Sequence, residues 1–133
     1  MITTYKEYLG QTKSLTFEEM NELQGKIISD ITGDEEAVEL YDELLEAAKK
    51  YSSFRAEWLL IDRQMKMDID PSRTSAHNSV ITHLNMLQRY LKMQGKAAAW
   101  RDELGFEDDD PYNRKKIGDF ACFLTFINSI NAR

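Results

Sequence analysis

The sequence is short of residues on which several protein classes depend. Its 133 residues include one cysteine, two prolines and six glycines. A single cysteine excludes a disulfide framework and a four-cysteine zinc site within the chain. No apolar run approaches the roughly 20 residues of a membrane-spanning helix, and the first residues lack the basic-then-apolar pattern of a secretory signal. We therefore expect one cytoplasmic domain with no membrane partner.

Acidic residues outnumber basic ones, and the two kinds are segregated along the chain. Behind the net charge of −6, residues 17–46 carry eleven acids and one base, whereas residues 49–101 carry ten bases and four acids. The overall negative charge argues against nucleic acid as a partner. The acidic segment either complements the basic segment within the fold or forms a docking surface for a basic protein partner.

Helix signals recur along the whole chain, and no stretch shows the alternation of a strand. Thr16 and Glu19 have the spacing of a capping box, and Asp70 followed by Pro71 is typical of a helix start. The last helix is apolar around most of its circumference, which favours a central position. The sequence predicts an all-α, single-domain bundle with four main helices, at about 17–32, 35–67, 71–94 and 111–131, and short helices near 4–10 and 96–104.

Polar residues interrupt the apolar faces of these helices. With a turn near Ile69, residues that face each other in an antiparallel hairpin have numbers totalling about 138, which places His77 beside Asp62. A carboxylate beside an imidazole fixes its tautomer and favours its charged form. On the last helix, Asp119 points inward and is expected to meet Arg73. The candidate polar site therefore contains Arg55, Asp62, Arg73, His77 and Asp119.

This polar site has three interpretations. It is a buried hydrogen-bonded network that fixes helix register, a small-anion sensor in which the arginines hold the ligand, or a catalytic pair formed by His77 and Asp62. Cys122 lies among phenylalanines, which favours a core thiol over a nucleophile.

Two acidic stretches have the spacing of a metal motif. They are Glu18-Glu19-Met20-Asn21-Glu22 and Glu39-Leu40-Tyr41-Asp42. The pair resembles the motif of the all-α nucleotide pyrophosphohydrolases, in which carboxylates on two helices hold magnesium against a triphosphate. The resemblance implies a magnesium-dependent enzyme that uses Glu19, Glu22, Glu39 and Asp42. The helical phase opposes this alternative, because it turns the carboxylates away from the apolar faces and toward solvent.

The second half of the chain carries a set of short motifs. They are Arg73-Thr74 through His77, Trp100-Arg101, Leu104-Gly105 and Ile117-Gly118-Asp119-Phe120. This set resembles a family of small uncharacterised helical proteins from Firmicutes and their mobile elements. The resemblance implies a bacterial origin and a cytoplasmic setting, and it carries over no catalytic role.

The leading functional hypothesis is a non-catalytic interaction or regulatory protein without a cofactor. It rests on the segregated charge and on the lack of a strong catalytic motif. The expected docking surface is an acidic helical face that contains Glu18, Glu22, Glu39 and Glu43. A homo-oligomer remains open as well.

Overall fold

The structure, a computed structural model, describes residues 15–104 and 111–131. These residues form helices and no strand, which confirms the all-α bundle. None of the described helices has the length and apolar character that crossing a membrane requires. The expected short helix near 4–10 lies outside the described residues. The helices are α2 (Phe17–Ile31), α3 (Glu35–Trp58), α4 (Arg63–Met93), α5 (Trp100–Glu103) and α6 (Pro111–Asn131).

The predicted starts of the first two described helices are confirmed. The Thr16 hydroxyl accepts a hydrogen bond from the backbone N–H of Glu19, and the Glu19 carboxylate accepts one from the N–H of Thr16, both at 3.1 Å. Gly33 follows α2 with φ of 85°, the left-handed conformation that glycine adopts most easily. Asp34 then caps α3 by accepting from the N–H of Ala37 at 3.1 Å. Local capping chemistry therefore fixes this part of the fold.

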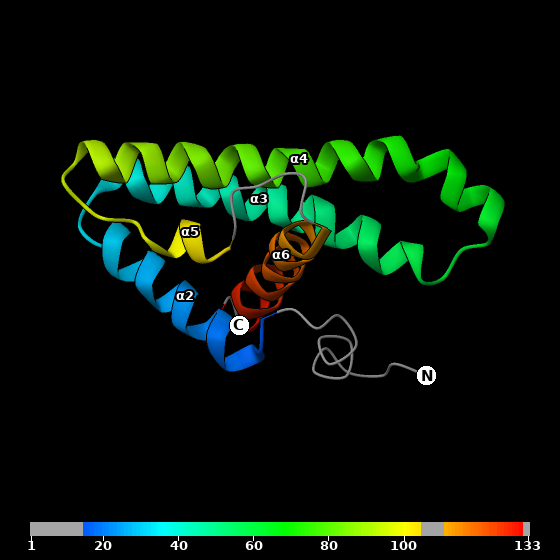
Figure 1. Ribbon diagram of the computed structural model, residues 1–133, viewed down its shortest axis with the longest axis horizontal. Helices are drawn as coiled ribbons and strands as arrows, with labels where there is room; N and C mark the ends of the chain where they lie inside the picture. The colour runs from blue at the N-terminus through cyan, green and yellow to red at the C-terminus, as the bar shows by residue number, and fades with distance from the viewer. Residues whose placement is uncertain (1–14, 105–110, 132–133) are drawn as a thin grey trace.

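The predicted boundary between helices 35–67 and 71–94 is wrong. Helix α4 begins at Arg63 and its N-cap is Asp62, whose carboxylate accepts a hydrogen bond from the N–H of Met65 at 2.9 Å. Pro71 lies inside α4 at an exposed position. A proline there removes one backbone hydrogen bond without disturbing the packed face, and it bends the helix. Figure 1 shows this bend near the N-terminal end of α4.

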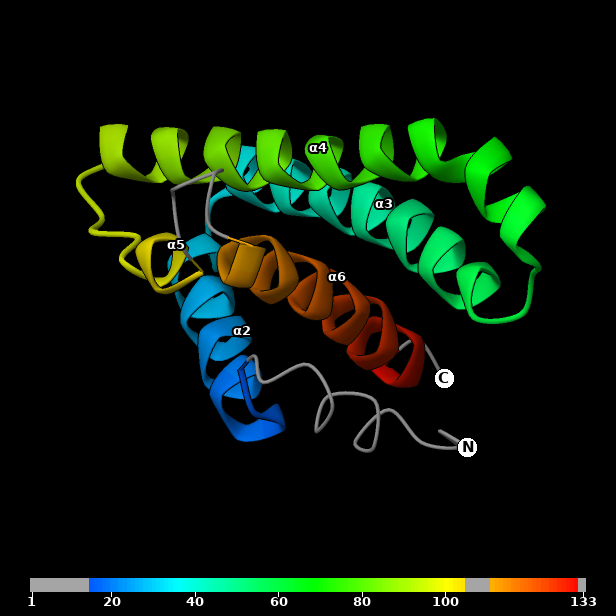
Figure 2. The ribbon, with the colours of Figure 1, turned by 45° about the vertical axis from the view of Figure 1, so that its right-hand side comes forward.

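Two long antiparallel helices form the frame of the molecule. Figures 1 and 2 show α3 and α4 side by side, with their connecting turn at one end of the molecule. Both views place α6 against α3, and α2 and α5 lie toward the end where α4 finishes. Residues 117–124 of α6 are all buried, so this helix is enclosed on several sides, as expected.

The close approach of α6 to α3 depends on a glycine. A Cβ atom at Gly118 would lie 2.7 Å from Nη1 of Arg55 and 2.8 Å from the phenol oxygen of Tyr51. No side chain fits at this position without displacing those groups. The absence of a side chain at Gly118 thus lets two polar residues of α3 reach the surface of α6.

Candidate functional site

A buried ion pair joins α3 to α6. Arg55 Nη2 lies 2.6 Å from Asp119 Oδ1, and the side chain of Asp119 is fully buried while that of Arg55 is 13% exposed. Two charges removed from water in this way require each other, because either one alone would remain uncompensated in the interior. The sequence identified both residues as inward-facing but paired Asp119 with Arg73, and that pairing is wrong.

Arg73 occupies a different position on the same side of the bundle. Its guanidinium carbon lies 4.5 Å from the centre of the Trp58 ring, and its Nη1 atom lies 3.5 Å from Asp70. Burial raises the pKa of Tyr51 to about 12, and the charge of Arg73 acts against that rise. Arg73 therefore links α4 to α3 through the Trp58 ring and the Tyr51 phenol.

His77 packs against Tyr51 and not against Asp62. The two rings meet edge to face, with centroids 5.2 Å apart and an interplanar angle of 70°, and His77 is 6% exposed. Asp62 caps the first turn of the helix that carries His77, roughly 22 Å away along its axis. The predicted His77–Asp62 pair is therefore wrong, because the hairpin turns at residues 59–62 and not near 69.

Tyr51 is the centre of the cluster, and the sequence analysis missed it. Its ring contacts His77, its phenol interacts with Arg73, and the guanidinium of Arg55 lies 5.9 Å from its centroid. Tyr51 and Arg55 are four residues apart and therefore share one face of α3. The structure brings Arg55, Arg73, His77 and Asp119 together around Tyr51, and it leaves Asp62 outside.

The thiol of Cys122, close to this cluster, is not activated as a nucleophile. Burial raises the pKa of Cys122 above its usual value, although Arg55 and a hydrogen bond with Ser52 oppose the rise. A thiol with a raised pKa is protonated near neutral pH, and the thiolate is the reactive form. Together with the ion pair and the ring contacts, this supports the interpretation of the cluster as a network that fixes the register of α3, α4 and α6.

A second buried polar group, also missed from the sequence, holds α5 in place. Arg101 is 1% exposed, and its Nε atom donates to Asn85 Oδ1 at 2.8 Å. Trp100 donates from its indole nitrogen to Asp30 at 3.0 Å, and Lys96 donates to the backbone carbonyl of Asp30. These bonds join α5 and the segment before it to α2 and α4, so Trp100 and Arg101 stabilise the fold.

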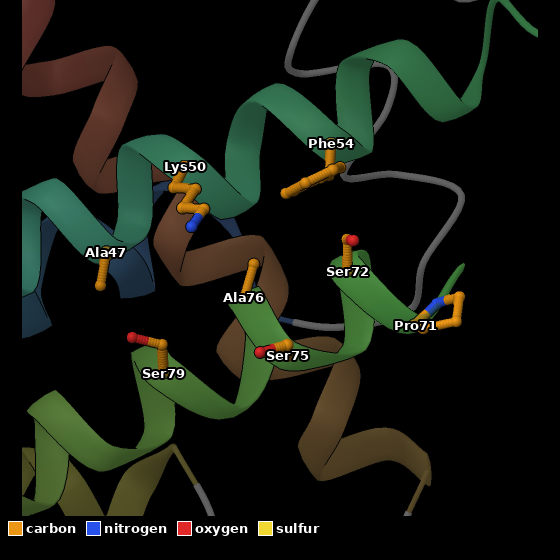
Figure 3. A pocket seen from close by; sticks show the side chains of 8 residues that line it. All are labelled: Ala47, Lys50, Phe54, Pro71, Ser72, Ser75, Ala76 and Ser79. Atoms are coloured by element: carbon orange, nitrogen blue, oxygen red, sulfur yellow. The ribbon is translucent and has the colours of Figure 1, made fainter. Parts of the chain in front are cut away.

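A groove runs between α3 and α4 on the surface. It has a volume of about 430 Å³, within the range typical of small-molecule sites. In Figure 3, Lys50 and Phe54 extend from α3 toward α4, whose wall carries three serine hydroxyls. The lining residues are Ala47, Lys50, Phe54, Pro71, Ser72, Ser75, Ala76 and Ser79.

The acids chosen from the sequence lie on the surface. Glu18 and Glu22 of α2 and Glu39 and Glu43 of α3 are all exposed, and none of them forms an ion pair with another described residue. Within 15–104 and the described part of α6, no three or more histidine, cysteine or acidic side chains gather in a group that would hold a metal ion. The residues of the magnesium alternative, Glu19, Glu22, Glu39 and Asp42, are all exposed and form no such group among the described residues.

In comparisons with known proteins, no family model, no curated protein and no solved structure matches this chain. The functional argument accordingly rests on the side chains of the chain itself.

Proposed function

We propose that this protein is a non-catalytic interaction protein that binds a basic partner through an acidic face on α2 and α3. The acidic face is defined by Glu18, Glu22, Glu39 and Glu43, all exposed. The resemblance of the second half of the chain to small proteins of Firmicutes supports a bacterial cytoplasm as the setting.

The observation that carries the proposal is that these glutamates form two like-charged pairs on exposed helix surface, without an ion pair to another described residue. Glu18 and Glu22 are separated by four residues on α2, and Glu39 and Glu43 by four residues on α3. Like charges at this spacing face each other on a helix and destabilise it by about 0.2–0.5 kcal/mol per pair. The helix dipole offsets this cost for Glu18, which lies in the first turn of α2. Attraction of a cationic partner accounts for the pair Glu39 and Glu43, which lies beyond the first turn of α3.

The face lies outside the packing that holds these helices. Met20, Leu23 and Ile27 turn the apolar side of α2 inward, and Tyr41 and Leu44 do the same for α3. The glutamates are therefore available to a partner without any rearrangement of the core.

The test neutralises the face and measures binding to a defined cationic probe. A fluorescent lysine- and arginine-rich helical peptide is titrated with the native protein and with a variant in which Glu18, Glu22, Glu39 and Glu43 are all glutamine. We expect the variant to lose at least about tenfold in affinity, equal to about 1.4 kcal/mol, and native binding to weaken as salt is raised.

A matched control removes the same four negative charges elsewhere. It carries glutamine or asparagine at Glu57, Asp68, Asp70 and Asp102, all exposed. If this control loses as much affinity as the first variant, binding follows net charge alone and the acidic face is not a docking site. Equal peptide affinity of the native protein and the first variant would contradict the proposal as well.

The groove between α3 and α4 favours a second candidate function, the binding of a small oxyanion. Lys50 supplies a positive charge, the α4 wall supplies serine hydroxyls, and no acid is among the groove's lining residues. The sequence analysis placed the anion in the cluster around Tyr51. The groove is the better candidate, because in the cluster Asp119 already neutralises the charge of Arg55.

The second candidate is tested with inorganic phosphate. Amide chemical shifts of Ser75 and Ser79 should respond to phosphate with a dissociation constant on the order of 1 mM. Lys50→Gln should abolish the response, and Lys49→Gln should leave it intact, because Lys49 pairs with Glu46 outside the groove. A response of the same size in both variants would exclude the groove as the site.

A further inference from the structure

The groove between α3 and α4 is larger than a bare oxyanion needs. At roughly 30 Å³ per water molecule, its volume of about 430 Å³ corresponds to more than ten waters. A phosphate ion replaces only a few of them. An oxyanion bound in the groove therefore leaves most of the space to a larger body attached to it.

Half of the residues that line the groove are apolar, and a bare ion makes no use of them. They are Ala47, Phe54, Pro71 and Ala76. Small-molecule sites combine an apolar lining with a few polar groups that fix the orientation of the ligand. The lining therefore fits an organic anion better than an inorganic one.

The positive charge of Lys50 is available to such a ligand. Lys49 Nζ lies 3.5 Å from a carboxylate oxygen of Glu46, whereas Lys50 forms no ion pair with any residue that the structure describes. Lys50 is exposed, and in Figure 3 its side chain extends from α3 toward α4. An ammonium group without a carboxylate beside it is a point charge that attracts an oxyanion.

Serine hydroxyls face Lys50 from the other wall. Figure 3 shows Ser75 and Ser79 of α4 across the groove from Lys50. The hydroxyl of Ser53 donates to the carbonyl of Lys49 at 3.1 Å, but that of Ser75 has no hydrogen bond to another described residue. A phosphate group offers several strong acceptor oxygens, so it can accept from the ammonium group and from a hydroxyl together.

An aromatic ring lies next to this polar end of the groove. Phe54 follows Lys50 by four residues, so the two side chains share one face of α3, about 6 Å apart along the helix axis. Because α3 and α4 are antiparallel, Phe54 lies opposite the earlier residues of the α4 wall, Ser72 and Pro71, as Figure 3 shows. A phenylalanine ring favours contact with a second flat ring, edge to face or offset.

We infer, building on the second candidate function, that the groove binds a phosphate monoester of a small flat ring. The phosphate group lies against Lys50 and Ser75, and the ring lies against Phe54 and Pro71. The separation of about 6 Å between Lys50 and Phe54 requires a short link between phosphate and ring. Lys50 supplies the attraction for any phosphate, and Phe54 selects the phosphates that carry a ring.

The test compares phenyl phosphate with methyl phosphate, which carries the same charge without a ring. Both are titrated into isotope-labelled protein and followed by amide chemical shifts. The native protein should bind phenyl phosphate at least about tenfold more tightly than methyl phosphate, with shifts at Ser75 and Ser79 for both. Nuclear Overhauser effects should connect the ring protons of phenyl phosphate to those of Phe54.

Three variants separate the two ends of the site. Phe54→Leu keeps an apolar side chain without a ring, so its preference for phenyl phosphate should fall to about twofold or less. Lys50→Gln should weaken the binding of both esters at least about tenfold. Lys49→Gln is the matched control and should bind both esters like the native protein, because Lys49 pairs with Glu46 and does not line the groove.

The outcomes distinguish this inference from the second candidate function. Equal affinity of the native protein for the two esters would overturn the inference and leave oxyanion binding in place. Binding of neither ester and of no inorganic phosphate would overturn both. A preference for phenyl phosphate that survives Phe54→Leu would place the ring elsewhere, and it would contradict the inference as well.

Discussion

Arg55 Nη2 and Asp119 Oδ1 approach to 2.6 Å at the point where α3 crosses α6, and the Asp119 side chain has no exposure to solvent. The contact exists because Gly118, the residue before Asp119, has no side chain to hold α3 away. A buried charge pair of this kind adds little to stability relative to apolar packing. It does restrict the helices to one register, because any slip would leave both charges unpaired in the interior.

Breaking this pair should be costly. We expect Asp119→Ala to lower the free energy of unfolding by about 3 kcal/mol, since Arg55 would keep its charge without a partner. Urea unfolding followed by circular dichroism measures the loss. The double variant Arg55→Met, Asp119→Leu should recover most of it, because it removes both charges and keeps apolar volume. A double variant as unstable as Asp119→Ala would show that the ion pair itself is needed.

Two glycines provide a matched comparison of packing. Gly118→Ala should destabilise the protein by about 1–3 kcal/mol, because the new methyl group meets Arg55 and Tyr51 at under 3 Å. Gly25→Ala should stabilise it by about 0.5–1 kcal/mol, since Gly25 lies on an exposed helical position with no atom within 4 Å of its Cβ direction. The melting temperatures of both variants, compared with that of the native protein, measure these changes in stability. Stabilisation by both substitutions would disprove the close approach of α6 to α3.

The parts of the fold that could be predicted from the sequence are those with local causes. Thr16 and Asp34 mark the starts of α2 and α3 in the sequence, because an N-cap bonds to a backbone N–H only three residues away. The boundary between α3 and α4 was predicted at the wrong place, because Asp70-Pro71 has the same local pattern as a true helix start. In the folded protein the N-cap of α4 is Asp62. Leu59 is apolar but lies exposed in the turn, and periodicity cannot distinguish a core residue from an apolar surface residue.

In the candidate site, too, the features with local causes could be predicted and those that depend on contacts between helices could not. Arg55, Arg73, His77 and Asp119 face inward because helical phase is a local property, so the sequence could group them. Their partners depend on the register between helices, and a turn misplaced along the hairpin changes every facing pair. Tyr51 was missed because a tyrosine on an apolar stripe does not look like a polar residue until its phenol is placed against Arg73.

The hydrogen bonds between Tyr90 and Asp34 make stability depend on pH. The phenol donates to the carboxylate oxygens at 2.8 and 2.9 Å, which lowers the pKa of Asp34 below its usual 3.8 and raises that of Tyr90 to about 12. A lowered carboxyl pKa gives stability that is present above about pH 3.8 and lost as the pH falls through the folded value. A raised phenol pKa gives stability that is present below pH 10 and lost as the pH rises toward 12.

Tyr90→Phe removes both contributions and tests this directly. Near neutral pH the native protein should have a higher urea midpoint than the variant. The difference should shrink as the pH falls below 3.8 and again as it rises from 10 toward 12. A difference that stays constant across the whole range would contradict the hydrogen bonds to Asp34.

The register of the hairpin can be measured with His77 as the reference. In a double-mutant cycle, His77→Ala and Tyr51→Leu should show a coupling energy of about 0.5–1.5 kcal/mol, because their rings are in contact. His77→Ala and Asp62→Ala should be additive within about 0.5 kcal/mol, since the two residues lie far apart along α4. Asp62→Ala alone should cost about 1 kcal/mol through loss of the cap at Met65, and Asp62→Ser should restore most of it. Strong coupling between His77 and Asp62 would restore the register predicted from the sequence and overturn the turn at residues 59–62.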